Sequence, residues 1–233
     1  MRKFLIAAGA LAIAGQAQAA NLLTNGSFED GLNGWVLSGA STGDNTANSD
    51  PQVIAYNQAS NYPTGAYGES VPTDNAAGNP GYDAVGTHGL YFSSDYGVQT
   101  LSQTVSLAAN TSYTFGFDYY LPANGYANPF DAVFSASVGS DTFTSFTLGS
   151  SAATNWILVS GSHTFTTNES GTFNFSFQAG GYTGKDIVID RVFLAQTSEI
   201  GSVPEVGTWA MMLAGFGAVG AVSRRRRTSL TFA

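Results

Sequence analysis

The stretch TLSQTVSLAANTSYTFGFDYY, residues 100–120, decides the fold class of the chain. It holds two runs in which apolar residues alternate with polar ones, Thr100–Leu107 and Thr111–Tyr120, with a short Ala-Ala-Asn turn between them. The second run carries an aromatic residue at every second position: Tyr113, Phe115, Phe117 and Tyr119. Side chains two residues apart lie on the same face of a β-strand. The pattern therefore predicts two strands, the second of which has one aromatic face.

The same pattern continues on both sides of this stretch, where β-branched and aromatic residues are enriched between turn residues. Further strands are predicted at Val53–Tyr56, Gly89–Ser93, Ala132–Val138, Thr142–Leu148, Trp156–Thr166, Thr172–Gln178 and Ile187–Leu194. No window before residue 206 shows the apolar periodicity of an amphipathic helix. The prediction is an all-β domain, and its many short strands favour a jelly-roll β-sandwich.

The first nineteen residues predict a secretory signal peptide. Arg2 and Lys3 precede an apolar segment over residues 4–15, and Ala17-Gln18-Ala19 supplies the small residues of a cleavage site. We expect cleavage after Ala19 and export of residues 20–199, a length that suits one domain, across the inner membrane.

The C-terminal segment has three parts in a fixed order. A linker over residues 200–205 is followed by a predicted transmembrane helix at 206–223 and by a basic tail at 224–233. The uncharged run 206–222 would form a helix of about 25 Å, just enough for a bilayer core of about 30 Å. The arginines of the tail would stay in the cytoplasm. The alternative is a buried core helix with a basic end, although such helices normally have a polar stripe.

This order of residues resembles the PEP-CTERM sorting signal of Gram-negative bacteria. The matching residues are Val203, Pro204, Glu205, Trp209, Arg224, Arg225, Arg226 and Arg227. Val206 departs from the pattern, since the family usually has a second proline there. The resemblance implies that an exosortase-type membrane protease removes the helix. The protein would be anchored in the membrane transiently and then delivered to the cell surface or the exterior.

Charge and cysteine content exclude several classes of function. Residues 20–203 hold fifteen acidic and two basic residues, a formal charge of −13 that the whole-chain value of −8 hides. Such a surface repels nucleic acid and anionic lipid, so no nucleic-acid partner is expected. The chain has no cysteine, which excludes disulfides, thiol catalysis and cysteine zinc sites.

The stretch NLLTNGSFEDGLNGW, residues 21–35, predicts a short apolar strand followed by two turns. It resembles the N-terminal signature of jelly-roll carbohydrate-binding modules of the galactose-binding-like superfamily. The resemblance implies that Trp35 is a core residue. It also implies a structural calcium ion that Glu29 and Asp190 hold together with backbone carbonyls.

The last predicted strand supports a partner for Asp190. Alternation places Asp190 on one face with Val188, Val192 and Leu194, and a carboxylate among apolar neighbours is costly unless it is paired or ligated. The neighbouring Arg191 leaves two alternatives to calcium. The arginine could pair with one of the two carboxylates, or the strand end could be solvated.

Residues 40–87 are rich in Gly, Asn, Ser, Asp and Pro, which predicts long loops around one strand. Four tyrosines on or beside these loops are candidate platforms for sugar rings: Tyr56, Tyr62, Tyr67 and Tyr82. The alternative is that these rings pin the loops to the sandwich.

The sequence therefore favours an exported, non-catalytic protein of the cell surface or the extracellular matrix, with exopolysaccharide as the expected ligand. Residues 39–43 fit the G-x-S-x-G nucleophile motif, but the residues after them do not predict the helix that this motif requires. No catalytic residue is expected. Two alternatives stay open: a structural or adhesive biofilm protein that binds no glycan, and a glycan-active hydrolase.

Overall fold

The computed structural model describes residues 20–39, 50–61, 64–93, 98–123, 131–139, 141–148, 155–179, 186–199 and 215–216. Residues 19–200 form one compact unit. The predicted signal peptide, the eight predicted sorting-signal residues and Tyr62 lie outside the described residues. Within the described ranges, no helix has the length and apolar composition needed to cross a membrane.

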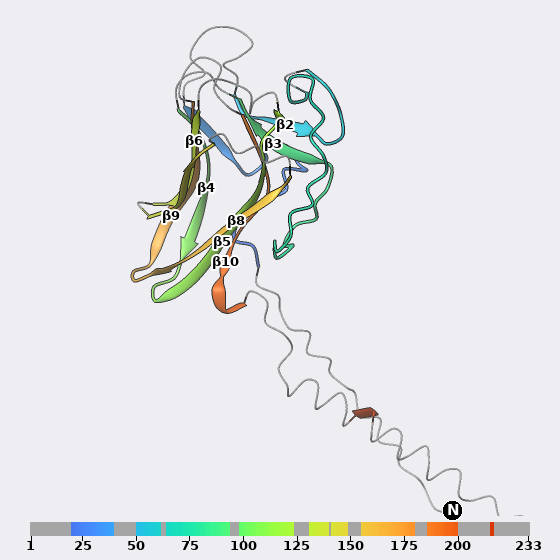
Figure 1. Cartoon of the computed structure of the whole chain (residues 1–233). Coiled ribbons are helices and arrows are strands. Elements are labelled where there is room, and N and C mark those ends of the chain that lie inside the picture. The colour runs from blue at the N-terminus through green and yellow to red at the C-terminus, as the bar shows by residue number, and fades with distance from the viewer. Residues whose placement is uncertain are drawn as a thin grey trace, which may run out of the picture. The chain divides into compact units, whose positions relative to one another are not determined.

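Ten strands form two five-stranded antiparallel sheets in the described part of the chain (Figure 1). Sheet A has the order β1 (Val36–Gly39), β4 (Val98–Leu107), β9 (Glu169–Ala179), β6 (Ala132–Val138) and β7 (Asp141–Thr147). Sheet B has the order β2 (Gln52–Ala55), β3 (His88–Phe92), β10 (Ile187–Gln196), β5 (Thr111–Tyr120) and β8 (Ile157–Phe165). The chain ends its described domain with a short 3-10 turn, η2 (Thr197–Glu199).

The last eight strands pair as a nested set. β6 pairs with β7, β5 with β8, β4 with β9 and β3 with β10. Successive pairs of this nest belong to opposite sheets, as they do when one long hairpin is rolled around a core. The all-β prediction is confirmed, and this pairing is that of a jelly-roll sandwich. β1 and β2 extend one edge of each sheet by pairing with β4 and β3.

The main core lies between the sheets and is largely aromatic. The predicted aromatic faces point inward: Phe115 and Phe117 of β5 and Phe173, Phe175 and Phe177 of β9 are all fully buried. Phe117 and Phe175 meet edge to face with ring centroids 5.3 Å apart. Burial of each such ring contributes about 1.5–3 kcal/mol. Both buried clusters of the domain lie between residues 23 and 195, so the segment 20–200 contains its own core.

The N-terminal stretch closes this core. Trp35 is 7% exposed and packs on Phe28, Phe173 and Phe175, with ring centroids 5.7 to 6.3 Å apart. Its core role is therefore confirmed. The apolar run before it forms bends and turns rather than a strand, and the edge strand β1 follows instead. Three of the four β1 residues are exposed. The strand therefore lacks the alternation of apolar and polar residues by which a strand is recognised in a sequence.

Candidate functional site: carboxylates and aromatic rings beneath residues 64–87

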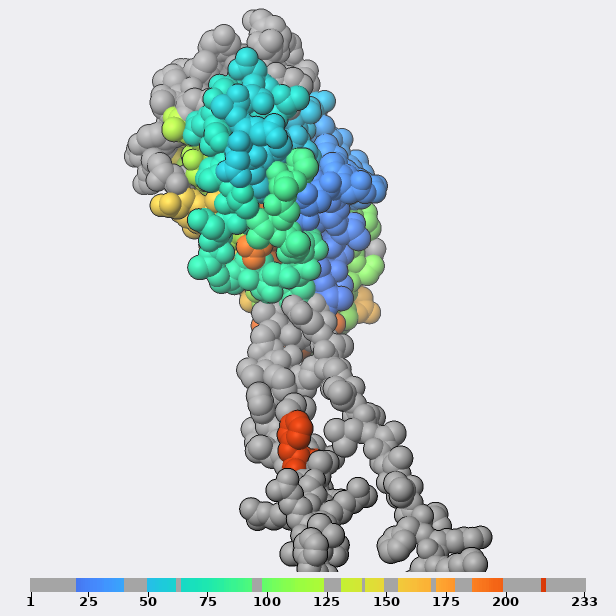
Figure 2. Space-filling view, turned by 90° about the vertical axis from the view of Figure 1, so that its right-hand side faces the viewer, coloured from blue at the N-terminus to red at the C-terminus, as the bar shows by residue number. Residues whose placement is uncertain are grey.

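Sheet B has a second buried cluster on its outer face, away from the main core. A segment without regular strands, residues 64–87, covers this face, and we call it the covering segment (Figure 2). Ala66, Val71 and Ala76 of the covering segment are buried against the sheet. The strands of sheet B and the residues directly beside them contribute aromatic and aliphatic side chains to the cluster: Ile54, Tyr56, Tyr91, Tyr120, Trp156 and Val188. The outer face of a sheet in a two-sheet sandwich is normally exposed to water. Here the covering segment shields it, and we take the residues buried beneath this segment as the candidate site.

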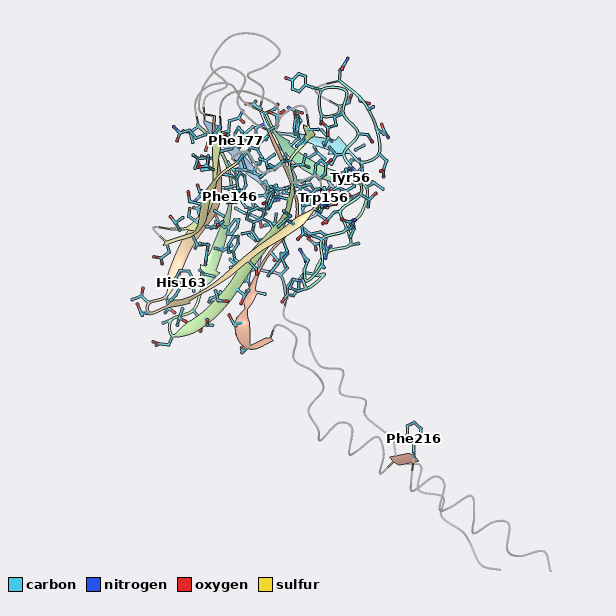
Figure 3. The ribbon with its side chains drawn as sticks, in the orientation of Figure 1. Tyr56, Phe146, Trp156, His163, Phe177 and Phe216 are labelled. Atoms are coloured by element: carbon cyan, nitrogen blue, oxygen red, sulfur yellow. The ribbon has the colours of Figure 1, made fainter. Side chains whose placement is uncertain are left out.

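Trp156 holds the centre of this aromatic group. Figure 3 shows Trp156 beside Tyr56. The ring centroid of Trp156 lies 5.6 Å from that of Tyr56, edge to face, and 5.7 Å from that of Tyr120. Its indole Nε1 donates a hydrogen bond of 2.8 Å to the carbonyl of Pro72 in the covering segment. A buried tryptophan normally finds a partner for this group, and here the partner fixes the segment to β8.

A β-bulge in β10 places the carboxylate of Asp190 in the same cluster. The register of β10 against β5 shifts between Asp190 and Phe193, and Arg191 has a left-handed φ of 48°. Val188 consequently packs on the outer face with Asp190, whereas Val192 and Leu194 belong to the main core. The predicted common face for these four residues was wrong, because strict alternation assumes a regular strand and a bulge inserts one extra residue.

Asp190 is completely buried and hydrogen-bonded. The Tyr56 hydroxyl donates to its Oδ2 across 2.6 Å, and the backbone N–H of Arg191 donates to its Oδ1 across 2.7 Å. Burial raises the pKa of Asp190 to about 9, and the hydrogen bonds offset only part of this effect. Burial likewise raises the pKa of Tyr56, with the charge of Asp190 adding to it. Asp190 is therefore a neutral carboxyl group near pH 7.

Asp74 and Asp118 form a second, adjoining carboxyl pair. Burial first, and then a hydrogen bond to Asp74 and the charge of Asp74, raise the pKa of Asp118 to about 8. Asp74 Oδ2 and Asp118 Oδ1 are both buried, and Arg191 Nη1 lies 3.6 Å from Asp74 Oδ2. Two buried carboxyl groups this close do not readily ionise together, which agrees with the raised pKa of Asp118.

Arg191 and Asn79 tie this pair to the strands. Arg191 Nη1 lies 3.6 Å from Asp74 and 3.5 Å from Asp118, and its side chain is 10% exposed. Asn79 Nδ2 donates to Asp118 Oδ2 across 2.9 Å and to the carbonyl of Arg191 across 3.1 Å. These contacts attach the covering segment to β5 and β10.

Glu29 lies at a different place in the domain. Its Oε1 accepts the backbone N–H groups of Thr87 and His88, both at 2.7 Å, and its Oε2 lies 3.1 Å from His88 Nδ1. Gly86, with a φ of +66°, lets the carboxylate approach, since a Cβ there would stand 2.2 Å from the Glu29 carboxyl carbon. Burial acts to raise the pKa of Glu29, but the hydrogen bonds from His88 and Thr87 outweigh it and lower the pKa.

Glu29 and Asp190 therefore have separate sets of partners. Among the described residues, no group of three or more His, Asp or Glu side chains is arranged to hold a metal ion. Arg191 donates to Asp190 only through its backbone, and its guanidinium pairs with Asp74 and Asp118 rather than with Glu29. The calcium ion stays a prediction. Arg191 is paired, but with Asp74 and Asp118, which the sequence did not suggest as its partners.

The candidate tyrosines divide into different roles. Tyr56 is 5% exposed, so its ring is a packing element and is not open to a ligand in this structure. Tyr82 is half-buried and packs on Phe193, with ring centroids 5.5 Å apart. Tyr67 is 38% exposed and meets Tyr91 edge to face at 6.4 Å. Of the three described tyrosines, Tyr67 offers the most ring surface.

Sequence reasoning missed Asp74, Asn79 and Asp118. Asp118 fits the alternation of β5 as an outward-facing polar residue, and such a residue is expected to meet water. Asp74 and Asn79 lie in a region whose composition predicts only loops. The burial of these residues depends on a loop folding back over a sheet, and no local pattern reports that event.

The position of the carboxyl groups limits their chemistry. Asp118 and Asp190 have no exposed surface, and Asp74 is 4% exposed. A general acid or base must come within hydrogen-bonding reach of its substrate. In this structure the three groups instead contact residues within or beneath the covering segment.

Comparison with known proteins gives the fold. No protein-family model matches the sequence, and no curated protein does. A cyclase from Fischerella sp. TAU in complex with 4-(1H-indol-3-yl)butan-2-one matches with a TM-score of 0.51 and 13% identity over 77% of this chain and 98% of that chain. The Stig cyclase Fisc from Fischerella sp. TAU matches with a TM-score of 0.50 and 16% identity over 76% and 98%. These likenesses support the two-sheet fold and do not assign an activity.

Carbohydrate-binding modules are also among the similar structures. TmCBM61 in complex with β-1,4-galactotriose matches with a TM-score of 0.45 and 22% identity over 76% of this chain and 98% of that chain. The order and pairing of its strands make the chain a jelly-roll β-sandwich.

Proposed function

We propose that the protein is an exported, non-catalytic module that binds a polysaccharide outside the cell, with Tyr67 as the principal contact. The observation that carries this proposal is the placement of the Tyr67 ring. Its ring is 38% exposed, and its backbone has a left-handed φ of 49°, which is rare for a bulky residue. Backbone strain of this kind concentrates at functional sites.

The surroundings of Tyr67 hold the ring in place. The turn from Ala66 to Glu69 is closed by a backbone hydrogen bond of 3.0 Å, and Gly68 donates 2.9 Å to the carbonyl of Ser60. Tyr91, which supports the ring, is itself buried and donates to Asp186. A preorganised ring loses little conformational entropy on binding, and its face suits the C–H face of a sugar. Glu69, two residues away, accepts the backbone N–H of Ala123 through its Oε1 across 2.7 Å, which ties this turn to the chain after β5.

The non-catalytic part of the proposal rests on the buried carboxyl groups described above and on the two histidines. His88 pairs with Glu29 and His163 with Asp141, each at 3.1 Å and each at a partly exposed position on a different strand. Thr87 Oγ1 lies 3.0 Å from His88 Nδ1 and 3.1 Å from Glu29 Oε2, so the hydroxyl group and the carboxylate meet the same ring nitrogen and do not form a chain through both nitrogens of the ring. Contacts of this kind between partly exposed groups contribute about 0–1 kcal/mol to stability.

A screen of soluble polysaccharides by affinity electrophoresis tests the proposal. Residues 20–200 should be retarded by at least one neutral polysaccharide, and Tyr67→Ala should abolish the retardation. Tyr119→Phe is the matched control, because Tyr119 is half-buried against Phe146. Retardation that survives in the Tyr67→Ala variant would place binding elsewhere.

A structural role in the matrix is the second candidate function. It is favoured by the burial of Tyr56, Tyr91, Tyr120 and Trp156 beneath the covering segment, which removes most aromatic rings of this face from solvent. In this case no polysaccharide would retard the protein, and its contribution would depend on its own assembly.

We further propose that the C-terminal segment is processed after export. Its residue order supports cleavage near Pro204 and Glu205 by an exosortase-type protease, after a transient stay in the membrane. The intact mass of the protein recovered from the cell exterior tests this. The expected mass lacks both the signal peptide and the arginines of residues 224–227, whereas a mass that retains these arginines would overturn the proposal.

A further inference from the structure

The outer face of sheet A is built from small uncharged side chains. The outward positions of its five strands are Val36, Ser38, Val98, Thr100, Ser102, Thr104, Ser106, Thr172, Asn174, Ser176, Gln178, Val133, Ser135, Ser137, Thr142, Ser145 and Thr147. Twelve of these seventeen residues carry a hydroxyl group, two carry an amide and three are valines. We call this surface the hydroxyl face. All of these residues are exposed or half-buried.

Strand register arranges these side chains in rows. One row crosses all five strands from β1 to β7: Ser38, Thr100, Ser176, Ser135 and Ser145. The next row also crosses all five strands: Val36, Ser102, Asn174, Ser137 and Thr142. Neighbouring strands are about 4.8 Å apart and successive rows about 6.8 Å apart, so the hydroxyl groups form a regular array.

The hydroxyl face contrasts with the rest of the domain in charge. None of its seventeen positions is charged, although residues 20–203 have a formal charge of −13. Acidic side chains that are exposed or half-buried lie outside these positions: Asp30 in the N-terminal stretch, Glu69 and Asp83 in the covering segment, and Asp141 at the first residue of β7. Asp131, directly before β6, stands at the rim of the hydroxyl face. Two copies of so acidic a domain repel each other, and the repulsion is weakest where two uncharged faces meet.

We propose that two copies of the protein associate through their hydroxyl faces, stacked sheet on sheet about a twofold axis. A twofold axis brings the same surface of each copy together, so an uncharged patch meets an uncharged patch. Short side chains allow two sheets to approach to about 10 Å. Val36 is 63% exposed and Val98 and Val133 are each 39% exposed, and stacking removes these methyl groups from water.

The area of the hydroxyl face limits how strongly two copies can associate. Five strands and three to four rows cover about 500 Å² per copy, or about 1,000 Å² in total. Stable specific interfaces bury about 1,200–2,000 Å². The hydroxyl face lies just below this range, so the dimer that it forms is weak and reversible. Such an interface would matter at high protein concentration, as in the extracellular location of the proposed function.

Sedimentation equilibrium of residues 20–200 tests this inference, over a range from about 1 μM to about 1 mM that brackets a weak interface. The expected result is a monomer–dimer equilibrium. Ser176→Glu places a charge at the middle strand of the face, opposite its own copy across the axis. This variant should weaken the dimer at least tenfold, while added salt restores part of the association.

Ser160→Glu is the matched control, because Ser160 is an exposed residue of β8 in sheet B. It should leave the dimer unchanged, and both variants should retain the wild-type melting temperature. A wild type that stays monomeric throughout the range would overturn the inference. So would a dimer that resists Ser176→Glu or that dissociates in Ser160→Glu. If polysaccharide binding is lost in Ser176→Glu and the wild type is monomeric, the face binds glycan instead.

Discussion

Tyr56 donates a hydrogen bond of 2.6 Å to Asp190, and both residues are buried. The bond connects the end of β2 to the bulge of β10 beneath the covering segment. It gives a polar partner to a carboxyl group that would otherwise be costly to bury, since an unsatisfied buried acceptor costs about 1–3 kcal/mol.

The Tyr56→Phe variant removes the donor and keeps the ring that packs on Trp156. The free energy of unfolding should fall by about 1–3 kcal/mol in urea denaturation at pH 7, because one acceptor of Asp190 loses its partner. Tyr119→Phe, which removes a hydroxyl group without a hydrogen-bond partner in the described residues, should cost less than about 0.5 kcal/mol. Equal effects of the two variants would show that the bond to Asp190 contributes nothing.

Stability should decrease from acidic toward alkaline pH because of the buried carboxyl groups. The folded-state pKa values of Asp118, about 8, and Asp190, about 9, lie above those of unfolded aspartate, about 3.9. The folded protein therefore binds these protons more tightly. Their contribution is fully present below pH ~4 and is lost as pH rises toward 8–9.

The Asp190→Asn variant isolates one of these protons. An amide stays neutral, so the difference in unfolding free energy between pH 5 and pH 8 should shrink relative to the wild type. The exposed substitution Asp30→Asn is the control and should leave that difference unaltered. An unchanged difference in Asp190→Asn would mean that this carboxyl group ionises normally and is hydrated.

The covering segment should open locally when Asn79 is replaced. Asn79→Ala removes the donor to Asp118 and to the carbonyl of Arg191, and a loss of about 1.4 kcal/mol corresponds to tenfold faster opening. Hydrogen exchange should accelerate in residues 71–83 and stay constant in β4 and β9. Asn174→Ala, which removes only a bond to Thr172 on an exposed strand, should leave residues 71–83 unchanged. Uniform acceleration throughout the domain would show that the segment does not open independently.

Much of the fold could be predicted from the sequence, because strand alternation is a local signal. The bounds of β5 and β6 were predicted to the residue, and other strands differ by one to three residues at their ends. β1 was missed because it pairs at a sheet edge and is mostly exposed. The bulge was missed because the residue with the left-handed φ is Arg191, and an arginine does not indicate a turn as glycine or asparagine does.

The candidate site was less predictable than the fold. Asp190 was correctly expected to need a partner, yet the partner found is Tyr56, a residue 134 positions away. Tyr56 itself was expected to face a ligand or pin a loop, and its burial matches the second of these interpretations. Which residues meet beneath the covering segment depends on long-range packing, and periodicity carries no information about that packing.

The predicted calcium ion can be tested by melting. If Glu29 and Asp190 hold calcium, the melting temperature of residues 20–200 should rise with millimolar calcium, because a ligand that binds only the folded state stabilises it. The rise should disappear in Glu29→Gln. Magnesium is the control for a general effect of divalent ions on an acidic protein. An unchanged melting temperature in calcium and in chelator would contradict the metal and leave Glu29 with Thr87 and His88 as its partners.

The most direct test of the central claim is calorimetric titration of residues 20–200 with the neutral exopolysaccharide of the producing organism. The account predicts saturable binding that is lost in Tyr67→Ala and retained in Tyr119→Phe, with the melting temperature of both variants preserved. Absence of heat with the wild type, or equal binding by Tyr67→Ala, would contradict the assignment of Tyr67 as the principal glycan contact.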